Sequence, residues 1–299
     1  SISVAQPDVI SIQLLSSNNV NCYQGQDGSA TVSVSGGNGG YVSSWKEVGT
    51  SSILSSTTTL SNVQAGVYRY TVVDSSGCTD SLDVTITQPS AALSSSIISK
   101  TDVLCNGDST GSITAQGTGG TLGSGYTYLW TNSSNLSVAN SSVAPGLLSG
   151  IYTCQVTDVN GCTHQINDTI LEPSTAVIIA ASGISNVLCF GGNTGSVWIN
   201  PSGGVSPYSF NWNNLVTNDT VVNLVAGTYS VNVTDDNGCI QNQSFSVTQP
   251  TVLTNSFTKS IYNGNTNVSC PSGTNGSIDL TPSGGSAPYT YLWSNTNNI

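Results

Sequence analysis

Eight cysteines and one histidine are the residues of this chain whose side chains could carry metal or redox chemistry. Six cysteines recur at similar spacing, one after the first expected strand of a repeat and one in the turn before its last strand: Cys22 and Cys78, Cys105 and Cys162, Cys189 and Cys239. Structural zinc requires Cys-x-x-Cys pairs or Cys/His clusters, and the sequence has neither. The spacing favours disulfides over metal, and disulfides place the protein outside the cytosol.

The number of strands decides how these cysteines pair. If six strands alternate up and down, the first and last turns of a repeat lie at the same end, whereas the seven strands of an immunoglobulin arrangement put them at opposite ends. Six expected strands predict bridges within each repeat: Cys22 to Cys78, Cys105 to Cys162 and Cys189 to Cys239. In the chain-entropy model each bridge stabilises its repeat by about 4 kcal/mol.

Two cysteines stand outside this scheme. Cys270 is the first cysteine of a fourth repeat, and we expect its partner beyond Ile299. Cys154 occupies an inward position of an alternating strand, so we expect a buried thiol that packs as a small apolar residue. A reactive thiol is the alternative.

Aspartates recur in the turns before the second cysteine of each repeat, at Asp74, Asp158 and Asp235. Oxygen-rich turns can bind Ca²⁺, but an Asp side chain also caps its own turn by accepting backbone N–H groups. The sequence has no Asp-x-Asp-x-Asp ligand run, so turn capping is the favoured interpretation. We therefore expect no cofactor and keep these three aspartates as candidate Ca²⁺ ligands.

The sequence offers no catalytic site. His164 is the single histidine, and no set of nucleophile, base and orienting residue can be assembled around it. The aspartates recur once per repeat, which suits architecture better than acid/base catalysis. We expect a protein that is not an enzyme and name no catalytic residue.

The amino-acid composition argues against two classes of binding partner, nucleic acids and anionic membranes. Charged residues make up 6% of the 299 residues, and the formal net charge is −11. A nucleic-acid binder needs a basic surface, and so does a protein that binds anionic membranes, so neither partner is expected. No apolar run reaches the roughly 20 residues of a spanning helix, and no signal-peptide pattern is visible at Ser1.

The stretch from Gly227 to Cys239 shows the fold class most clearly. Tyr229, Val231 and Val233 alternate with polar residues, which is the period of a half-buried strand, and an Asp-Asn-Gly turn follows. The same pattern occurs twice earlier in the chain. For the third repeat we expect six strands, at 175–181, 196–200, 208–213, 220–225, 228–234 and 242–249. The prediction is an all-β chain of tandem immunoglobulin-like β-sandwich modules.

Large aromatic residues recur once per repeat in the expected strands. We expect them to anchor the core of each sandwich. The set comprises Trp45, Trp130, Trp212 and Trp293, together with Tyr68, Tyr152 and Tyr229. A sugar-stacking platform is the alternative role for the tryptophans, and Trp198 is the single candidate for an exposed aromatic.

The repeats divide the chain into modules. We expect residues 1–7 to close a preceding module, repeats 1, 2 and 3 to cover 8–89, 90–173 and 174–250, and an incomplete repeat 4 to occupy 251–299. A Pro and one or two polar residues separate successive modules, without a Gly/Ser linker. Because proline restricts both its own φ and the preceding residue, we expect the modules to stack as a semi-rigid rod.

Repeat 3 contains an ordered series of motifs: Asn186 to Cys189, Gly195-Ser196, Ser202 to Gly204, Pro207 to Trp212, Ala226 to Asp235, Asn237 to Cys239 and Gln249-Pro250. This series resembles the SprB-type repeat of Bacteroidetes cell-surface proteins. The resemblance covers essentially the whole chain. Repeat 2 departs from it by having Gly125-Tyr126 in place of Pro-Tyr and by adding Cys154.

The resemblance implies a very large secreted filament on the outer surface, exported by the type IX system and serving as a mobile adhesin in gliding motility. Its implied partners are further modules of the same polypeptide, outer-membrane secretion and motility machinery, and a surface polysaccharide or substratum. Four Asp-Ser/Thr triplets match the O-glycosylation pattern of that phylum, with Ser81, Ser109, Thr169 and Thr220 as candidate acceptors. A carbohydrate-binding array beside an enzyme and a passive surface coat are the alternative functions.

Overall fold

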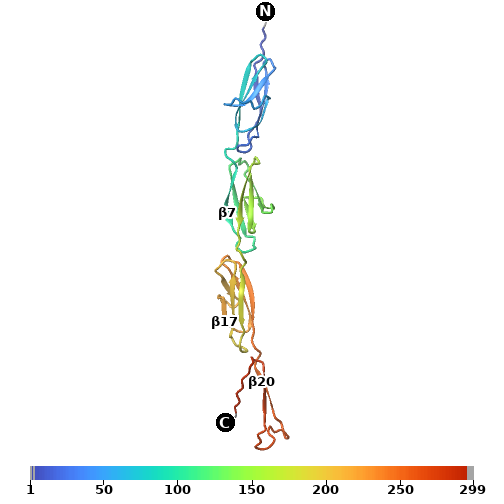
Figure 1. Ribbon diagram of the computed structural model, residues 1–299, viewed down its shortest axis with the longest axis vertical. Helices are drawn as coiled ribbons and strands as arrows, with labels where there is room; N and C mark the ends of the chain where they lie inside the picture. Colours follow the sequence, from blue (N-terminus) through green and yellow to red (C-terminus); the bar gives the residue numbers. More distant parts are fainter. Residues whose placement is uncertain (1, 3, 295–299) are drawn as a thin grey trace. The chain divides into compact units, whose positions relative to one another are not determined.

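The structure is a computed structural model that describes residue 2 and residues 4–294 (Figure 1). Every regular element among these residues is a β-strand, so the described chain contains no helix that could cross a membrane. The side chains along the strands alternate between buried and exposed, as in β2, whose inward residues include Ala30 and Val32. Period-2 alternation in the sequence therefore decides the fold class.

Repeat 1, drawn in blue in Figure 1, is a sandwich of two three-stranded antiparallel sheets. One sheet has the order β1 (Ser11–Asn18), β2 (Gly28–Ser35), β4 (Thr59–Val63), and the other has the order β3 (Val42–Glu47), β5 (Gly66–Val73), β6 (Thr79–Ile86). Apolar residues from both sheets form one buried cluster, including Val32, Trp45, Leu60 and Val72. This is the aligned packing of two sheets that defines an immunoglobulin-like sandwich.

Repeats 2 and 3 repeat this plan. In repeat 2 the sheets are β7 (Ser94–Thr101), β8 (Gly111–Thr118), β11 (Val143–Leu147) and β9 (Thr127–Asn132), β10 (Ser137–Ala139), β12 (Gly150–Thr157), β13 (Thr163–Ile170). In repeat 3 they are β14 (Ile178–Ser185), β15 (Gly195–Ser202), β17 (Thr220–Leu224) and β16 (Ser209–Trp212), β18 (Gly227–Thr234), β19 (Ile240–Val247). The described part of repeat 4 has one sheet, β20 (Thr254–Lys259) with β21 (Ile278–Ser283).

The chain separates into two compact units that do not follow the repeat boundaries. The first contains the residues up to Val103 together with Ser109–Leu171. The second contains Leu104–Asp108 and the chain from Glu172 onward. The five residues of the β7–β8 turn thus belong to the unit that holds repeat 3.

The chain reverses its direction once more than six alternating strands would, in the segment between the third and fourth predicted strands of a module. In repeat 1, β3 and β4 run in the same direction, because residues 48–58 turn the chain back between them. Trp45 and Ser55 form an antiparallel bridge in this return, and in repeat 2 the return becomes a seventh strand, β10. The turn after β1 and the turn between β5 and β6 therefore lie at opposite ends, separated by a strand of roughly 27 Å.

Backbone contacts fix which end is which. At the end where repeat 1 closes, Val20 N donates to Thr87 O at 2.9 Å, and Gln24 N donates to the Gln88 side chain at 2.7 Å. At the end where it opens, Gly37 N donates to Asp8 O at 2.8 Å. Cys22 lies at the closing end, and Cys78 lies at the opening end.

The Asn-Val-x-Cys and Gln-Pro motifs form one clamp at the closing end. In repeat 3, Thr248 N donates to the Asn186 side chain at 2.9 Å, and Gly191 N donates to the Gln249 side chain at 2.7 Å. The position two residues after the first cysteine has a positive φ in every repeat, occupied by Gln24, Gly107, Gly191 and Ser272. The left-handed backbone there turns the amide toward the Gln or Glu side chain.

The recurring aromatics fill the cores of the three complete sandwiches. Trp45, Trp130 and Trp212 are at most 1% exposed, and Tyr68 and Tyr152 are also buried, whereas Tyr229 is partly buried against the core of repeat 3. Each of these tyrosines donates from its hydroxyl to the carbonyl four residues earlier, at 2.9 to 3.1 Å. This contact is the tyrosine corner of Greek-key sandwiches.

Trp293 was expected to anchor a core, but it is 60% exposed. The described residues of repeat 4 provide a single two-stranded sheet, so no second sheet faces this side chain. Within the described residues Trp293 is therefore not a core anchor, because burial of a sandwich tryptophan requires both layers.

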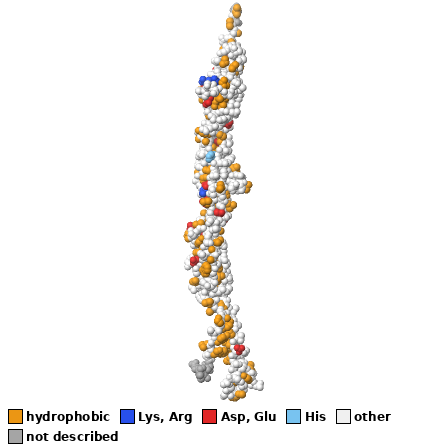
Figure 2. All heavy atoms as spheres, viewed as in Figure 1, with side chains coloured by type: hydrophobic (Ala, Val, Ile, Leu, Met, Phe, Trp, Pro, Cys, Tyr) orange, Lys and Arg blue, Asp and Glu red, His pale blue; other side chains and the backbone are white. Residues whose placement is uncertain are grey.

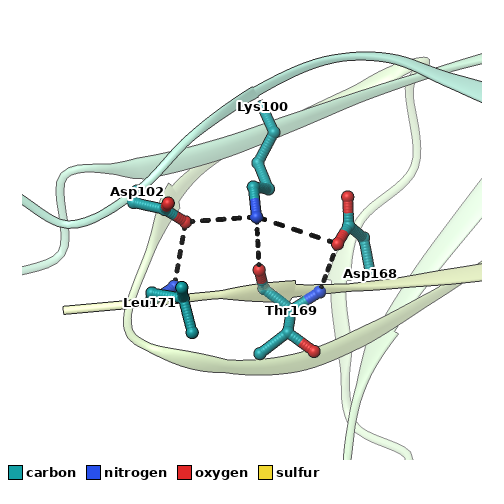
Figure 3. A network of polar contacts seen from close by, with 5 residues as sticks. All are labelled: Lys100, Asp102, Asp168, Thr169 and Leu171. Atoms are coloured by element: carbon teal, nitrogen blue, oxygen red, sulfur yellow. Dashed lines mark hydrogen bonds and ion pairs between the residues drawn. The ribbon is translucent and has the colours of Figure 1, made fainter.

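Ion pairs are few among the described residues. Figure 2 shows few acidic or basic side chains over the face that it displays. In repeat 2, Lys100 of β7 donates to Thr169 O at 3.0 Å and lies 3.5 Å from Asp102 and 3.9 Å from Asp168 (Figure 3). These side chains are about one third exposed, so the network contributes little to stability.

Candidate functional site: the disulfide junction between repeats

The first disulfide joins repeat 1 to repeat 2. Cys22, in the turn after β1, bonds to Cys162, in the turn between β12 and β13, across a sequence separation of 140 residues. Their Cα atoms are 5.7 Å apart. Beside the bridge, Asn160 Nδ2 donates to Asn21 O at 2.9 Å. The disulfide and this hydrogen bond thus cross the junction in addition to the polypeptide itself.

The second disulfide has the same construction. Cys105, in the turn after β7, bonds to Cys239, in the turn between β18 and β19, across 134 residues. Asn237 Nδ2 donates to Leu104 O at 2.9 Å. The first cysteine of one repeat is therefore bonded to the second cysteine of the next repeat in both cases.

The predicted bridges within each repeat are wrong. Cys22 and Cys105 do not bond to Cys78 and Cys162, and Cys189 does not bond to Cys239; Cys78 and Cys189 are free and exposed. The physical reason is the strand reversal, which puts the two cysteines of a module at opposite ends. At that separation a disulfide cannot form, because its Cα atoms must lie within about 7 Å.

The buried aspartates hold the second-cysteine turn in shape. Asp158 is 5% exposed, and its Oδ1 accepts from Asn160 N at 3.0 Å and Cys162 N at 2.9 Å. Its Oδ2 accepts from Thr121 N at 2.9 Å, which ties the turn to the glycine-rich turn before β9. Asp235 and Asp74 make the corresponding contacts in repeats 3 and 1.

These contacts bear on the candidate Ca²⁺ ligands. Asp74, Asp158 and Asp235 lie in different repeats, and the described residues contain no group of three His, Cys, Asp or Glu side chains placed to share a metal. Both carboxylate oxygens of each aspartate already accept backbone N–H groups. The arrangement is that of a turn cap.

The Asn-Gly-Cys sequence has a local reason. Gly238 has a φ of 85°, in the left-handed region that favours glycine, and this lets Cys239 N return to the Asp235 carboxylate at 2.8 Å. The asparagine before the glycine then points outward, where its amide reaches the neighbouring repeat. The glycine of the motif therefore shapes its own turn, and the asparagine binds the first-cysteine turn of the neighbouring repeat.

The junction turn of repeat 1 predicts an acid-sensitive stability. Hydrogen bonds from the backbone amides of Asn38, Cys78 and Ser76 lower the pKa of Asp74, against an opposing effect of burial. Because the folded-state pKa is depressed, its stabilisation is complete above the ordinary Asp pKa of about 3.9 and is lost as pH falls through the lower folded value. Hydrogen exchange of β5 amides should accelerate in that window, and Asp74→Asn should remove this pH dependence.

Asp83 provides the control for this prediction. Its pKa is lowered mainly by a hydrogen bond from Arg69, and this ion pair is exposed. Salt at about 1 M should abolish the effect of Asp83→Asn because exposed charges are screened at that concentration. An Asp74 effect that also disappeared in salt would contradict the role of the backbone amides.

Cysteine labelling should separate the free thiols into two groups. Cys78, Cys189 and Cys270 are exposed, whereas Cys154 is 0% exposed on β12 and burial raises its pKa to about 11. In the native isolated chain, iodoacetamide should modify the three exposed thiols and leave Cys154 unmodified until the protein unfolds. Mass spectrometry of the labelled peptides measures this. Modification of Cys154 at the rate of Cys189 would support a reactive thiol instead.

The remaining candidate residues lie apart from the junctions. Ser81, Ser109 and Thr220 are exposed, and Thr169 is partly buried. His164 Nδ1 lies 2.7 Å from Ser95 Oγ in repeat 2. This pair touches no carboxylate among the described contacts, so the geometry supplies no orienting acid for a serine nucleophile.

Tandem immunoglobulin-like sandwiches joined by disulfides define an all-β repeat protein. The SprB repeat family model matches residues 14–50, 97–135, 181–217 and 265–298. Each match contains the first cysteine and the recurring tryptophan of its repeat. The chain is a SprB-type repeat protein.

Several solved structures of tandem domains are similar to the chain. Three N-terminal domains of the outer capsid protein Hoc of bacteriophage RB49 are 14% identical, with 81% of this chain and 95% of that chain covered and a TM-score of 0.35. A marsupial T cell receptor is 12% identical over 79% and 100% of the two chains, with a TM-score of 0.35. Extracellular domains 3–5 of Drosophila OTK are 11% identical over 80% and 97%, with a TM-score of 0.26. No curated protein matches the chain.

The asparagine contact across the junction was missed in the sequence. The Asn-Gly-Cys motif was read as turn chemistry alone, although two of three repeats have Asn before the glycine and Ser76 replaces it in the third. A turn needs Gly at this position but does not require Asn before it. The recurrence of Asn at a position where the turn does not require it is the signal that could have indicated a contact outside the turn.

Proposed function

We propose that this chain is a load-bearing stalk segment of a large secreted cell-surface adhesin filament that acts in gliding motility or surface attachment. One observation carries the proposal: both disulfides join successive repeats and neither closes a repeat on itself. A bridge within a module stabilises that module. A bridge between modules resists their separation.

The junctions double the covalent connection between repeats. Repeats 1 and 2 are joined once by the polypeptide through Pro89 and again by Cys22–Cys162. The Asn160 amide and the clamp of Gln24 on Gln88 hold the bonded turn in place. Traction on an adhesin would pass through both connections, so unfolding of one sandwich would not release the full length of the chain.

The location and export of this stalk are part of the proposal. Disulfides between exposed turns require an oxidising compartment, which supports an extracellular site on the cell surface. We propose a Bacteroidetes source, export by the type IX system and attachment to outer-membrane motility machinery, on the basis of the SprB repeats. Contact with a polysaccharide or other substratum would then lie with parts of the filament outside these repeats.

A carbohydrate-binding array has one residue in its favour. Trp198 is 46% exposed on β15, and it lies over Gly183 of the neighbouring edge strand, where a Cβ would come within 2.4 Å of the indole nitrogen. An indole that covers a strand glycine has a packing role. The equivalent positions in repeats 1 and 2 are Thr31 and Thr114, so no aromatic platform recurs along the array.

The test uses cells that produce the full polypeptide. Antibodies against this segment should label intact, non-permeabilised cells. Replacing Cys22 and Cys105 with serine in the genomic copy should reduce attachment under flow while leaving surface labelling unchanged, and Cys154→Ala provides the matched control. Labelling that requires permeabilisation would refute the surface location, and normal attachment of the double variant under flow would refute the load-bearing role.

A further inference from the structure

The opening end of repeat 1 carries an unbonded cysteine beside a hollow. Cys78 is free and exposed. The hollow next to it is lined by the segment before β1, the glycine-rich turn after β2 and the β5–β6 turn. Ile10, Gly37 and Asp74 are among its lining residues. Gln6 and Pro7 line the same hollow.

The corresponding hollow of repeat 3 is lined in part by a bonded first-cysteine turn. There Val177, Gly204 and Cys239 stand where Ile10, Gly37 and Cys78 stand in repeat 1. The hollow is completed by Cys105, Asn106 and Asp108 of the β7–β8 turn, and Cys105 forms the disulfide to Cys239. The second-cysteine end therefore binds a first-cysteine turn in repeat 3, and the Cys22–Cys162 bond shows the same arrangement in repeat 2.

We propose that Cys78 is a covalent docking site for the Asn-Val-x-Cys turn of the SprB repeat to which Gln6 and Pro7 belong. In the bonded turn beside the hollow of repeat 3, Asn106 Nδ2 donates to Pro173 O at 2.8 Å, and Gly107 N donates to Glu172 Oε2 at 2.7 Å. Gln6-Pro7 is the equivalent of Glu172-Pro173. The two acceptors that hold a first-cysteine turn are thus already present beside Cys78, which identifies the occupant.

The bond forms by thiol–disulfide exchange. The Cys78 thiol and the thiol of the incoming turn each lose a proton, and one S–S bond forms between them. The two electrons reduce the disulfide of a Cys-x-x-Cys oxidoreductase, which takes up two protons and leaves as the dithiol. Atoms and electrons balance with that class of oxidant as the co-reactant.

One local difference shows what holds this junction. Ser76 stands where Asn160 and Asn237 reach across the other two junctions, and its hydroxyl accepts from Asn38 Nδ2 at 2.7 Å. The crossing amide is therefore absent at Cys78. The disulfide and the Gln6-Pro7 acceptors carry the docking there.

Disulfide mapping of the full native polypeptide tests the site. Surface protein is alkylated with iodoacetamide before it is digested without reduction, and cross-linked peptides are identified by mass spectrometry. Cys78 should be found linked to a peptide whose cysteine follows Asn-Val-x or Asp-Val-x, and its alkylated fraction should fall from nearly complete in the isolated chain to nearly zero. In a full-length Cys78→Ala variant, that partner cysteine should become alkylated.

Each other outcome overturns the inference. Alkylated Cys78 in the native protein or a mixed disulfide with a small thiol would show that the site does not bind a first-cysteine turn. A bond to Cys189 would show that the bound turn is not that of the repeat to which Gln6 and Pro7 belong. The inference builds on the proposed stalk, but the two can fail separately. If Cys22–Cys162 and Cys105–Cys239 are present while Cys78 is alkylated, the stalk junctions stand and the docking site does not.

Discussion

A chain pulled from its two ends with its disulfides intact should stop extending at about half the length that the reduced chain reaches. The reason is that the two bridges interleave, because Cys105 lies inside the loop closed by Cys22 and Cys162, and Cys239 lies outside it. The shortest covalent route runs from residue 1 to 22, across to 162, back to 105, across to 239 and on to 299. It contains about 140 residues instead of about 300, or about 490 Å of extended chain instead of about 1,040 Å.

Single-molecule force spectroscopy with handles at the two ends measures this contour length. Addition of a reducing agent should restore the full extension. Cys22→Ser should give an intermediate value, because the remaining Cys105–Cys239 bridge leaves a route of about 165 residues. Cys154→Ala should not change the contour length in either redox state. An oxidised chain that extends to the full length of the reduced chain would contradict the interleaved pairing.

Replacing Asp158 with alanine should lower the free energy of unfolding of repeat 2 by about 3 to 5 kcal/mol. The carboxylate is buried and accepts three backbone amides, those of Thr121, Asn160 and Cys162. Alanine leaves these donors without an acceptor in a site that water does not reach freely, so the variant loses charged hydrogen bonds and keeps the desolvation cost. Chemical denaturation of the reduced and the oxidised chain measures the change.

Asp168 is the matched control in the same repeat. Its carboxylate is partly exposed, accepts from the adjacent Thr169 N at 2.7 Å and lies 3.9 Å from Lys100 (Figure 3). Asp168→Asn should cost less than about 1 kcal/mol, as exposed ion pairs do. Equal effects of the two substitutions would show that Asp158 is a surface charge and that the turn is held by other contacts.

The strands could be predicted because they depend on local alternation. Tyr229, Val231 and Val233 lie on one face of β18, and the predicted strand at 228–234 differs from Gly227–Thr234 by one residue. The first strand of repeat 3 was placed at 175–181 but runs from Ile178 to Ser185. Its later residues, such as Ser182 and Gly183, are neither apolar nor β-branched, so their strand state depends on pairing with β15.

The pairing of the cysteines could not be predicted because it depends on a segment without a pattern. Residues 48–58 are rich in Ser and Thr and form no named strand in repeat 1, yet they reverse the chain. The equivalent strand β10 has only three residues. A count of alternating runs omits such a segment, and one omitted reversal exchanges the ends at which the two turns lie. Repeats 1 and 3 have the expected six strands, but the premise that successive strands alternate in direction was wrong, because β3 and β4 run the same way.

The junction also has a direction. Its two sides are different turns. In both junctions the clamped turn after the first strand of one repeat bonds to the Asp-capped turn before the last strand of the next repeat. The two turns therefore cannot exchange places. Any repeat presents one of each at opposite ends, so a repeat could be inserted or removed as a whole without leaving an unmatched cysteine inside the array. Such a chain can change its length in steps of one module while every internal bridge keeps the same two kinds of partner.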